Sequence, residues 1–247
     1  MTVTTISVNN GILITGDNSN NFIFSTTAND TIFAYAGNDT INGGGKGEDR
    51  LVALDSIGGG SGGNDYIDGG LGNDLIFGTS GDDTINGGAG NDTIFDFQGA
   101  NLLSGGAGND SISASGFIDT VTGGAGADSL QLDNTQRVKY NSPSEGDVLE
   151  QIGGFDPVGG GDSAPDQFLI SAGGFGGGLA LGTLPAIQFL AGAGVTTATT
   201  SAQRFLFNTT DFTLRFDKDG TGALAPVFIA TLDSSALTLA AIDFTIF

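Results

Sequence analysis

The stretch GGLGNDLIFGTSGDDTINGGAGNDTIF, from Gly69 to Phe95, contains three successive copies of one nine-residue pattern. Each copy starts with glycine, has aspartate at its sixth position and has isoleucine at its eighth position. Glycine adopts backbone conformations that are closed to other residues, and successive side chains of a strand point to opposite faces. The pattern therefore predicts a glycine-rich turn followed by a short strand whose middle side chain points inward, with two units in each turn of a flattened parallel coil.

The same pattern extends to both sides of this stretch and gives twelve units. Units begin at Gly16, Ser25 and Ala34, and an insertion at Gly43 precedes the unit that begins at Gly44. An interruption at residues 53–59 separates these units from eight contiguous units between Gly60 and Gln131. The sixth positions are Asn21, Asp30, Asp39, Asp49, Asp65, Asp74, Asp83, Asp92, Asn101, Asp110, Asp119 and Asp128. The eighth positions are all large aliphatic residues: Ile23, Ile32, Ile41, Leu51, Ile67, Ile76, Ile85, Ile94, Leu103, Ile112, Val121 and Leu130.

A second period of eighteen residues supports the two-sided coil. Units on the same side of such a coil should resemble each other more than their neighbours in sequence do. Copies that begin with two glycines start at Gly69, Gly87, Gly105 and Gly123, whereas the units between them lose the pattern progressively after Gly78. The coil should therefore have two unequal sides.

Composition restricts the chemistry of the chain. Its 247 residues carry a formal net charge of -21 and include neither histidine nor cysteine, which excludes Ser-His-Asp and Cys-His catalytic pairs and thiolate or imidazole metal sites. The acidic charge argues against binding to nucleic acids and to anionic membrane surfaces. No apolar run is long enough for a transmembrane helix, and residues 1–15 do not resemble a Sec signal peptide. Of the 28 acidic residues 25 are aspartate, which together with abundant glycine indicates sites for hard cations built from loops.

The pattern GGxGxDxUx, where U is a large aliphatic residue, resembles the calcium-binding nonapeptide repeat of the RTX (repeats-in-toxin, haemolysin-type) family. The resemblance implies an all-β fold, an RTX parallel β-roll followed by a capping β region. It also implies that turns of successive coils hold Ca²⁺ between them through sixth-position carboxylates and turn carbonyls, with roughly 6 to 10 ions in all. The implied metal-binding residues are Asp30, Asp39, Asp49, Asp65, Asp74, Asp83, Asp92, Asp110, Asp119 and Asp128, with Gly70, Gly72, Gly88, Gly90, Gly106, Gly108, Gly124 and Gly126.

The alternative is a metal-free coil in which these aspartates only form turns. That alternative has most weight where Asn21 and Asn101 replace aspartate, and the site at Asp119 is weakened because Phe117 replaces the fourth-position glycine. Asp68 and Asp82 lie outside the sixth column and are not expected to be direct ligands.

Calcium should control folding. About eight Ca²⁺ would reduce the net charge from -21 to roughly -5 and relieve the repulsion between stacked carboxylates. At a Kd of ~1 mM and ~10 mM Ca²⁺, each site contributes about 1.4 kcal/mol and eight sites contribute roughly 11 kcal/mol, which is comparable to the stability of a whole domain. The chain should then be unfolded at cytosolic calcium concentrations and folded outside the cell.

The domain organisation expected from these patterns has three parts. Residues 1–15 form a strand that leads into the coil, residues 16–131 form the β-roll, and residues 132–247 form a C-terminal β cap. Strands are expected in the cap at residues 167–172, 179–191, 204–208, 212–216, 227–232 and 237–247, with glycine-rich loops at 153–161 and 173–178 and no helix. The segment from Gln203 to Asp233, together with the final DFTIF, resembles the end of secreted bacterial RTX proteins, cyanobacterial ones especially. This implies an uncleaved signal for type I secretion.

The motif DKDG, Asp217 to Gly220, has two interpretations. It forms the turn of a hairpin between residues 212–216 and 227–232, or it is an additional calcium site. The second interpretation lacks an aspartate two positions before Asp217 and has Pro226 where an EF-hand has its bidentate glutamate.

No enzyme is expected. The chain has no HExxH motif, no GxSxG motif with a partner base, and no helices or acylated lysines typical of a pore-forming toxin. A glycosidase built on Glu145, Glu150 or Asp166 is disfavoured because carboxylates on glycine-rich loops are usually solvated. We expect a secreted, non-enzymatic, structural calcium-binding protein, and its open strand edges favour self-association into a homo-oligomer or filament. The alternative is an adhesin or other recognition module for glycan or ice, although threonine does not form the regular array that ice binding requires.

Overall fold

The computed structural model of the chain describes residues 4–8, 11–44, 47–52, 63–78, 80–133, 136–141, 151–153, 166–176, 178–232 and 239–247. The chain forms two compact units, Met1–Gly123 (unit 1) and Gly124–Phe247 (unit 2). The interruption at residues 53–59, the loop at 154–161, and Glu145 and Glu150 lie outside the described residues. No helix in the described part of the chain is long and apolar enough to cross a membrane.

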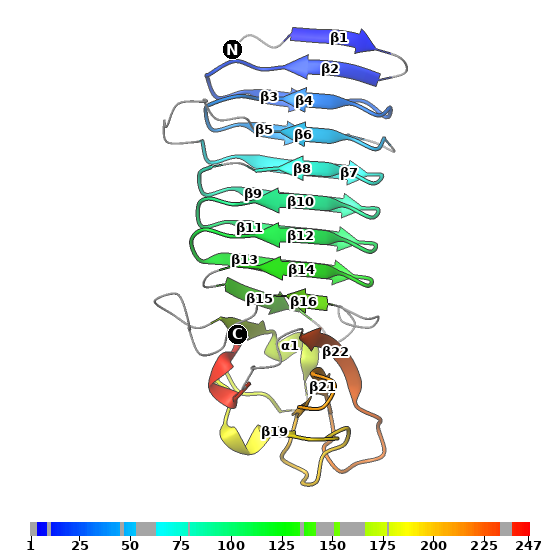
Figure 1. The fold of residues 1–247 in the computed structure, drawn as a ribbon, viewed down its shortest axis with the longest axis vertical. Coiled ribbons are helices and arrows are strands. Elements are labelled where there is room, and N and C mark those ends of the chain that lie inside the picture. Colours follow the sequence, from blue (N-terminus) through cyan, green and yellow to red (C-terminus); the bar gives the residue numbers. More distant parts are fainter. Residues whose placement is uncertain are drawn as a thin grey trace. The chain divides into compact units, whose positions relative to one another are not determined.

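Unit 1 is a parallel β-coil, as the nonapeptide pattern predicts (Figure 1). Its strands are β1 (Thr4–Val8), β2 (Gly11–Thr15), β3 (Phe22–Phe24), β4 (Thr31–Phe33), β5 (Thr40–Asn42), β6 (Arg50–Val52), β7 (Tyr66–Leu71), β8 (Leu75–Phe77), β9 (Thr84–Ala89), β10 (Thr93–Asp96), β11 (Leu102–Ala107) and β12 (Ser111–Ala114). Strand β13 (Asp119–Ala125) crosses from unit 1 into unit 2. From β2 to β12, each strand pairs in parallel with the strand two places later, so even-numbered and odd-numbered strands form two separate sheets.

The eighth residue of every nonapeptide forms the core of the coil. All twelve of these aliphatic side chains are at most 1% exposed. The strand registers stack them directly, with Ile76 beside Ile94 and Ile94 beside Ile112 in the even sheet. Each fully buried aliphatic side chain contributes roughly 1.5 to 3 kcal/mol, so this column supplies the hydrophobic part of the fold.

The structure corrects the position of the insertion. Gly43 N–H donates to the Asp68 carbonyl at 2.7 Å, as Gly78 N–H, a first-position donor, does to the Phe95 carbonyl at 3.1 Å. Gly43 therefore occupies the first position of its unit, and Gly44, with a φ of 92°, occupies the second. The extra residue therefore falls between Gly44 and Gly47, a position that the run of three glycines from Gly43 to Gly45 did not reveal.

The first fifteen residues contain two strands. Strands β1 and β2 pair antiparallel from Thr4 opposite Thr15 to Val8 opposite Gly11. Strand β2 then pairs in parallel with β4, so the coil begins inside the segment that we expected to lead into it.

Unit 2 continues parallel pairing without the nonapeptide sequence. It contains β14 (Ser129–Leu132), β15 (Gln136–Tyr140), β16 (Gln151–Gly153) and β17 (Gln167–Ile170). Strand β14 pairs in parallel with β16, and β15 pairs in parallel with β17. The inward side chains remain large and apolar here, for example Val138, Tyr140 and Phe168, so stacking persists after the glycine–aspartate turns end.

The rest of unit 2 is mainly antiparallel. It contains β18 (Gly182–Thr183), β19 (Phe189–Gly192), β20 (Phe205–Asn208), β21 (Thr213–Phe216), β22 (Val227–Leu232) and β23 (Phe244–Ile246). Strands β20, β21 and β22 pair antiparallel in sequence, which confirms the predicted hairpin around DKDG. Phe244 joins the two parts of the unit 2 core, because its ring centroid lies 5.1 Å from that of Phe168 and 4.9 Å from that of Phe205.

Three local predictions for unit 2 are wrong. Residues 179–191 do not form one strand: Gly182 has a φ of 106°, and Pro185 precedes the 3₁₀ helix η2 (Ala186–Gln188), so only short strands remain on either side. A helix, α1 (Ala172–Phe175), lies where a loop was expected, with Ser171 Oγ accepting from Gly174 N–H at 3.3 Å. The last predicted strand is shortened to β23 by the 3₁₀ helix η3 (Ala241–Asp243).

Candidate metal centre

The first-position glycine and the sixth-position aspartate of one unit share a small space inside the coil. A Cβ atom built on Gly69 would lie 2.5 Å from Asp74 Oδ2, and one built on Gly87 would lie 2.5 Å from Asp92 Oδ2. Both distances are too short for a real Cβ atom. The glycine therefore makes room for the aspartate side chain to fold back into the coil.

The sixth-position side chains that precede even-numbered strands form a continuous hydrogen-bonded column, which we call the even ladder. Its members in unit 1 are Asp30, Asp49, Asp74, Asp92 and Asp110. The backbone N–H of each residue donates to Oδ1 of the next at 2.7 to 2.8 Å, and Ile12 N–H donates to Asp30 Oδ1 at 2.7 Å. All five aspartates are at most 2% exposed.

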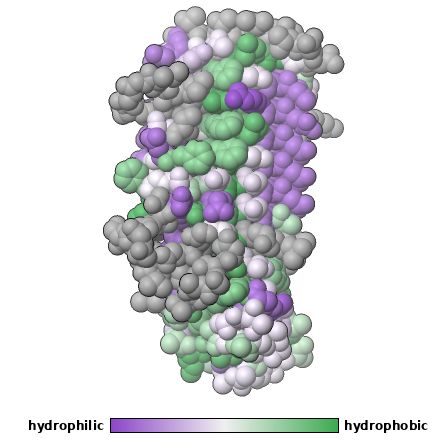
Figure 2. Space-filling model, in the orientation of Figure 1, coloured by the Kyte–Doolittle hydropathy of each residue, from purple (hydrophilic) through white to green (hydrophobic). Residues whose placement is uncertain are grey.

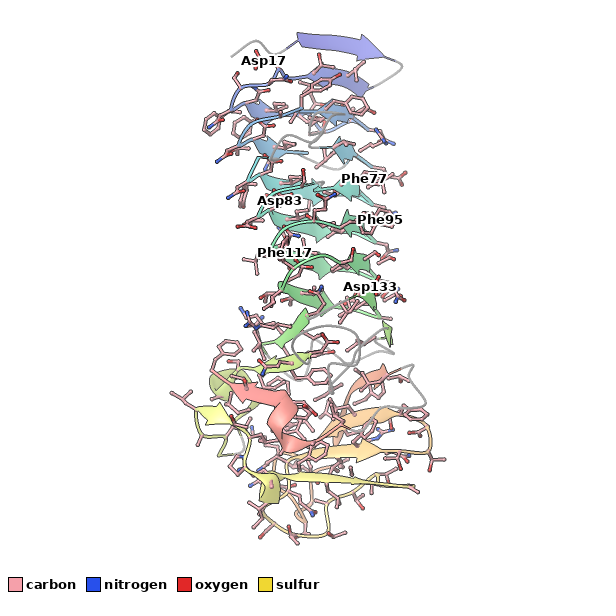
Figure 3. All side chains as sticks on the ribbon, turned by 60° about the vertical axis from the view of Figure 1, so that its left-hand side comes forward. Asp17, Phe77, Asp83, Phe95, Phe117 and Asp133 are labelled. Carbon is pink, nitrogen blue, oxygen red and sulfur yellow. The ribbon has the colours of Figure 1, made fainter. Side chains whose placement is uncertain are left out.

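A second column, the odd ladder, lies at or just before the start of the odd-numbered strands. Its members are Asn21, Asp39, Asp65, Asp83, Asn101 and Asp119, joined by the same backbone-to-Oδ1 bonds at 2.7 to 2.8 Å. Asp83 marks the position of this ladder in Figure 3. The bond from Asp39 N–H to Asp65 Oδ1 spans the interruption and is 2.7 Å long, so the ladder is continuous there. The structure thus brings every predicted sixth-position aspartate of unit 1 into one of two ladders.

The ladders concentrate negative charge where no water reaches it. The Oδ2 atoms of Asp49, Asp74 and Asp92 are buried and accept no hydrogen bond in the described structure. Burial, followed by repulsion from neighbouring carboxylates, raises the pKa of Asp49 to about 6 and that of Asp74 to about 7, and burial also raises the pKa of Asp92. Asp30 differs because hydrogen bonds from Ser25, Thr26 and Ile12 outweigh burial and lower its pKa. Without a cation, the even ladder is therefore electrostatically unfavourable at neutral pH.

The predicted turn glycines stack in two columns, in which each glycine lies against the carbonyl group of the glycine one turn before it. Gly70, Gly88 and Gly106 have φ values of 100° to 111°, and Gly72, Gly90 and Gly108 have values of 126° to 143°. A Cβ on Gly88 or Gly106 would collide with the carbonyl oxygen of the glycine one turn before it, and the same is true of Gly90 and Gly108. Successive turns therefore stack carbonyl against glycine, an arrangement that a side chain would block.

These residues fit a hard divalent cation. Ca²⁺ binds six to eight oxygens, and carboxylates, carbonyls and water all serve as its ligands. Within the described part of the chain, no three acidic side chains converge on one point, so a bound ion must take many of its ligands from turn carbonyls. Each regular coil therefore offers both kinds of donor, a buried Oδ2 atom without a hydrogen bond and the carbonyl groups of its glycine turn.

The unit 2 residues predicted to bind metal have the same local conformation. Asp128 is 1% exposed, and Gly124 and Gly126 have φ values of 114° and 139°. The last nonapeptide therefore repeats the turn geometry of the Gly-Gly copies in unit 1.

The three positions at which metal binding was least expected, Asn21, Asn101 and Asp119, also lie in the odd ladder. Asn21 and Asn101 are buried and accept or donate in the ladder as aspartate does, so asparagine preserves its geometry while removing one charge. Near Asp119, the left-handed backbone conformation occurs at Gly116, with a φ of 117°, and the Phe117 side chain is 71% exposed (Figure 3). This turn is thus built differently from the others.

The fifth position makes a third set of contacts, which was not expected from the sequence. Asn91 N–H donates to Asn73 Oδ1 at 2.7 Å, and Asn109 N–H donates to Asn91 Oδ1 at 2.8 Å. Asp82 belongs to the corresponding column on the other side, since its Oδ1 accepts from Ala100 N–H at 2.9 Å. The repeated asparagine before the aspartate was the available signal. These amides are exposed, and Figure 2 shows a hydrophilic column along the right side of the coil.

Asp68 lies outside both ladders. Its carboxylate accepts from the side-chain amides of Asn42 and Asn86 at 3.3 and 3.0 Å, on the outer face of the odd sheet. It therefore crosslinks neighbouring coils from outside.

The DKDG motif forms a turn that its own side chains stabilise. Asp219 N–H lies 3.2 Å from Asp217 Oδ1, and Asp219 Oδ2 accepts from Leu224 N–H at 3.1 Å. Gly220 has a φ of 68°. These contacts account for the motif as the connection between β21 and β22.

Aromatic side chains form a column on the outer face of the even sheet. The rings of Phe77 and Phe95 stack with centroids 5.3 Å apart (Figure 3), and Phe97, two residues after Phe95 in the same coil, lies beside Phe95 with centroids 6.0 Å apart. Arg50 lies over the rings of Phe33 and Phe77 at 5.2 and 5.5 Å. Figure 2 shows hydrophobic residues gathered along the middle of the coil in this view.

The repeats match a known family model. The model of the RTX calcium-binding nonapeptide repeat matches residues 15–51, 59–94, 77–112 and 113–134, slightly less than half of the chain. A comparison with curated proteins gave no match. The chain therefore contains RTX calcium-binding nonapeptide repeats, and Ca²⁺ is the ion that they bind.

Proposed function

We propose that this chain is a secreted, non-enzymatic protein that folds when it binds calcium outside the cell and then has a structural role. The observation that carries the proposal is the pair of buried aspartate ladders. Buried carboxylates stacked at the ~4.8 Å strand spacing repel one another unless protons or cations neutralise them. Calcium in the medium supplies that neutralisation.

Calcium dependence fits the order of synthesis and export. Extracellular calcium modules bind at about 0.1 to 1 mM, well above cytosolic calcium concentrations. The ladders would therefore stay unformed inside the cell, which keeps the chain extended for transport. RTX-repeat proteins generally use type I secretion, and the signal for it would lie in the segment from Gln203 to Phe247.

A structural role in a matrix, surface layer or filament is supported by the open edges of the sheets. Among the described residues, β3 pairs with β5 alone, at one end of the odd sheet. Phe22 and Phe24 on this strand are 60% and 68% exposed. An unpaired strand edge beside exposed aromatic side chains favours association with a second copy of the chain.

The proposal is tested by titrating the EDTA-stripped chain with calcium while far-UV circular dichroism and light scattering are recorded. A cooperative gain of β-structure at about 0.1 to 10 mM Ca²⁺, absent with Mg²⁺, is expected. A mass that grows with protein concentration at saturating calcium would support self-association. A stripped chain that is already β-rich and does not respond to calcium would refute the folding switch, and a constant monomeric mass would refute the filament.

Recognition of a glycan is the second candidate function, because aromatic and apolar side chains are exposed on both units. In unit 1, Phe97 is 50% exposed beside the partly exposed rings of Phe77 and Phe95, and in unit 2 Leu181 and Ile187 are 76% and 69% exposed. Exposed patches of this kind often mark binding surfaces. Affinity electrophoresis in gels containing polysaccharide tests this function, with Phe95→Ser as the variant that should lose retardation. Equal mobility of the wild-type chain with and without polysaccharide would argue against it.

A further inference from the structure

The unit Asp96–Ser104 departs from the repeat at two positions simultaneously. Its sixth position is Asn101, which lacks a charge, and its first position is Asp96, where the regular units have a small residue. The first and sixth positions share one space, because the sixth-position Oδ2 atoms of Asp74 and Asp92 occupy the volume of a first-position Cβ. A side chain at the first position therefore enters the same interior space by a different path.

Asp96 points into the coil. It ends β10, is 0% exposed, and its Oδ2 atom accepts no hydrogen bond in the described structure. A Cβ built on Gly78, the first-position residue one turn earlier, would collide with this Oδ2 atom. Oδ1 makes a long contact of 3.3 Å with Gln98 N–H. A fully buried carboxylate whose backbone hydrogen bond is this long, and whose Oδ2 atom accepts none, requires another source of stabilisation.

The neighbours of Asp96 are members of the odd ladder. Its carboxyl group is close to the side chains of Asp83 and Asn101 and interacts with the charge of Asp119. Asn101 joins these residues, since it accepts from Asp83 N–H and donates to Asp119 Oδ1, both at 2.8 Å. Two ionised carboxylates in contact repel each other, so Asp83 and Asp96 need a shared proton or a cation between them.

We propose that Asp96 is the metal-binding carboxylate of its unit and holds Ca²⁺ together with the neighbouring part of the odd ladder, a role that Asn101 does not fill. The ladder then keeps one carboxylate per turn from Asp65 to Asp119, although the sixth-position pattern shows a gap. The inference rests on calcium binding by the repeats and adds a ligand that the nonapeptide consensus does not contain.

The unit that contains the other asparagine provides an internal comparison. Asn21 follows Gly16, so its first position has no side chain, and Asp17 contacts Asn21 from a partly exposed position. No buried carboxylate takes over there among the described residues. We therefore expect a calcium site at Asn101 and a weaker site or none at Asn21.

The test compares calcium stoichiometry in the full chain by equilibrium dialysis with radioactive Ca²⁺. Asp96→Asn removes the charge but keeps the shape, and the number of ions bound at saturation should fall by at least one. The double variant Asp96→Gly with Asn101→Asp moves the carboxylate to the consensus position and should restore the wild-type number. Asp133→Asn, an exposed position in unit 2, is the charge-matched control and should bind as the wild type does.

The possible results distinguish a failure of the role of Asp96 from a failure of calcium binding by the whole chain. An Asp96→Asn variant with wild-type stoichiometry and wild-type calcium dependence of its thermal midpoint would overturn the role of Asp96. A double variant that folds in calcium but still lacks the ion would also overturn it, because the carboxylate would not be the missing ligand. A wild-type chain that binds no calcium would refute the proposed function itself.

Discussion

Replacing Asp92 by asparagine should stabilise the calcium-free coil and destabilise the calcium-loaded coil. Asp92 lies in the middle of the even ladder, 1% exposed, with Asp74 before it and Asp110 after it. Asparagine preserves the ladder bond, because Asn101 already accepts the equivalent bond from Asp83 N–H at 2.8 Å. The substitution therefore removes charge while leaving the hydrogen bonding intact.

The expected magnitude follows from the spacing of the ladder. Two ionised carboxylates one strand spacing apart, ~4.8 Å, repel by about 3 kcal/mol at an effective dielectric constant of about 20. Partial protonation of the ladder reduces this value, since the pKa of Asp74 is raised by burial to about 7. We expect the calcium-free form to gain about 1 to 3 kcal/mol. In calcium at about a hundred times Kd, the loss of the sites on both sides of Asp92 costs roughly 5 kcal/mol, which exceeds the gain.

The stabilisation in EDTA and the destabilisation in calcium can both be measured on the same variant. In EDTA, the concentration of the stabilising osmolyte TMAO needed to fold the chain should be lower for Asp92→Asn than for wild type. In calcium, the urea midpoint should be lower for the variant, while Asp133→Asn should change neither value. If Asp92→Asn destabilised the chain in EDTA as well, the carboxylate would be acting as a turn former, and the argument from buried charge would be wrong.

Three further predictions concern pH, turn geometry and the unit 2 core. Burial raises the pKa of Asp49 to about 6 and that of Asp74 to about 7, whereas the unfolded chain titrates near 3.8, so the calcium-free fold should lose stability as pH rises from about 4 to about 7. Circular dichroism in EDTA checks this, and a β signal that increases with pH would contradict it. Gly88→Ala should cost about 2 kcal/mol or more in a urea titration, because its φ is 110° and its Cβ would strike a carbonyl, whereas Gly173→Ala in α1 has space and should be tolerated. Phe244→Ala should cost about 3 to 5 kcal/mol with and without calcium, and a calcium-dependent loss would show that the core of unit 2 depends on the ladders.

The repeat region was predictable because one short pattern specifies both its turns and its core. The eighth-position aliphatic residues and the sixth-position aspartates recur at fixed spacing, and every one of them is buried as expected. The backbone-to-Oδ1 bonds were not predicted, since nothing in a single unit shows which neighbour its carboxylate reaches. The role of Asp96 was also missed, because the pattern places the metal ligand at the sixth position and this unit has asparagine there.

Unit 2 was harder to predict because its strands pair across long separations. Gln151 and Ile152 of β16 lie beside Thr231 and Leu232 of β22, and no local pattern indicates that pairing. Each of the two 3₁₀ helices depends on a single residue. Pro185 precedes η2, and the Asp243 carboxylate caps η3 by accepting from Ala240 N–H at 2.7 Å. The aromatic core could be predicted as apolar, but the contacts between particular rings depend on the tertiary arrangement.

The ladders also determine where the chain can change in length. Most bonds in the ladders join residues 18 apart in sequence, yet those from Asp39 to Asp65 and from Asp49 to Asp74 span 26 and 25 residues with the same 2.7 Å length. Extra sequence between two turns therefore leaves the alignment of carboxylates above and below it unchanged. A deletion of nine residues would instead exchange the two ladders for every later turn. Such a coil can acquire or lose loops and whole turns through evolution while the register of its ion-binding turns is inherited intact.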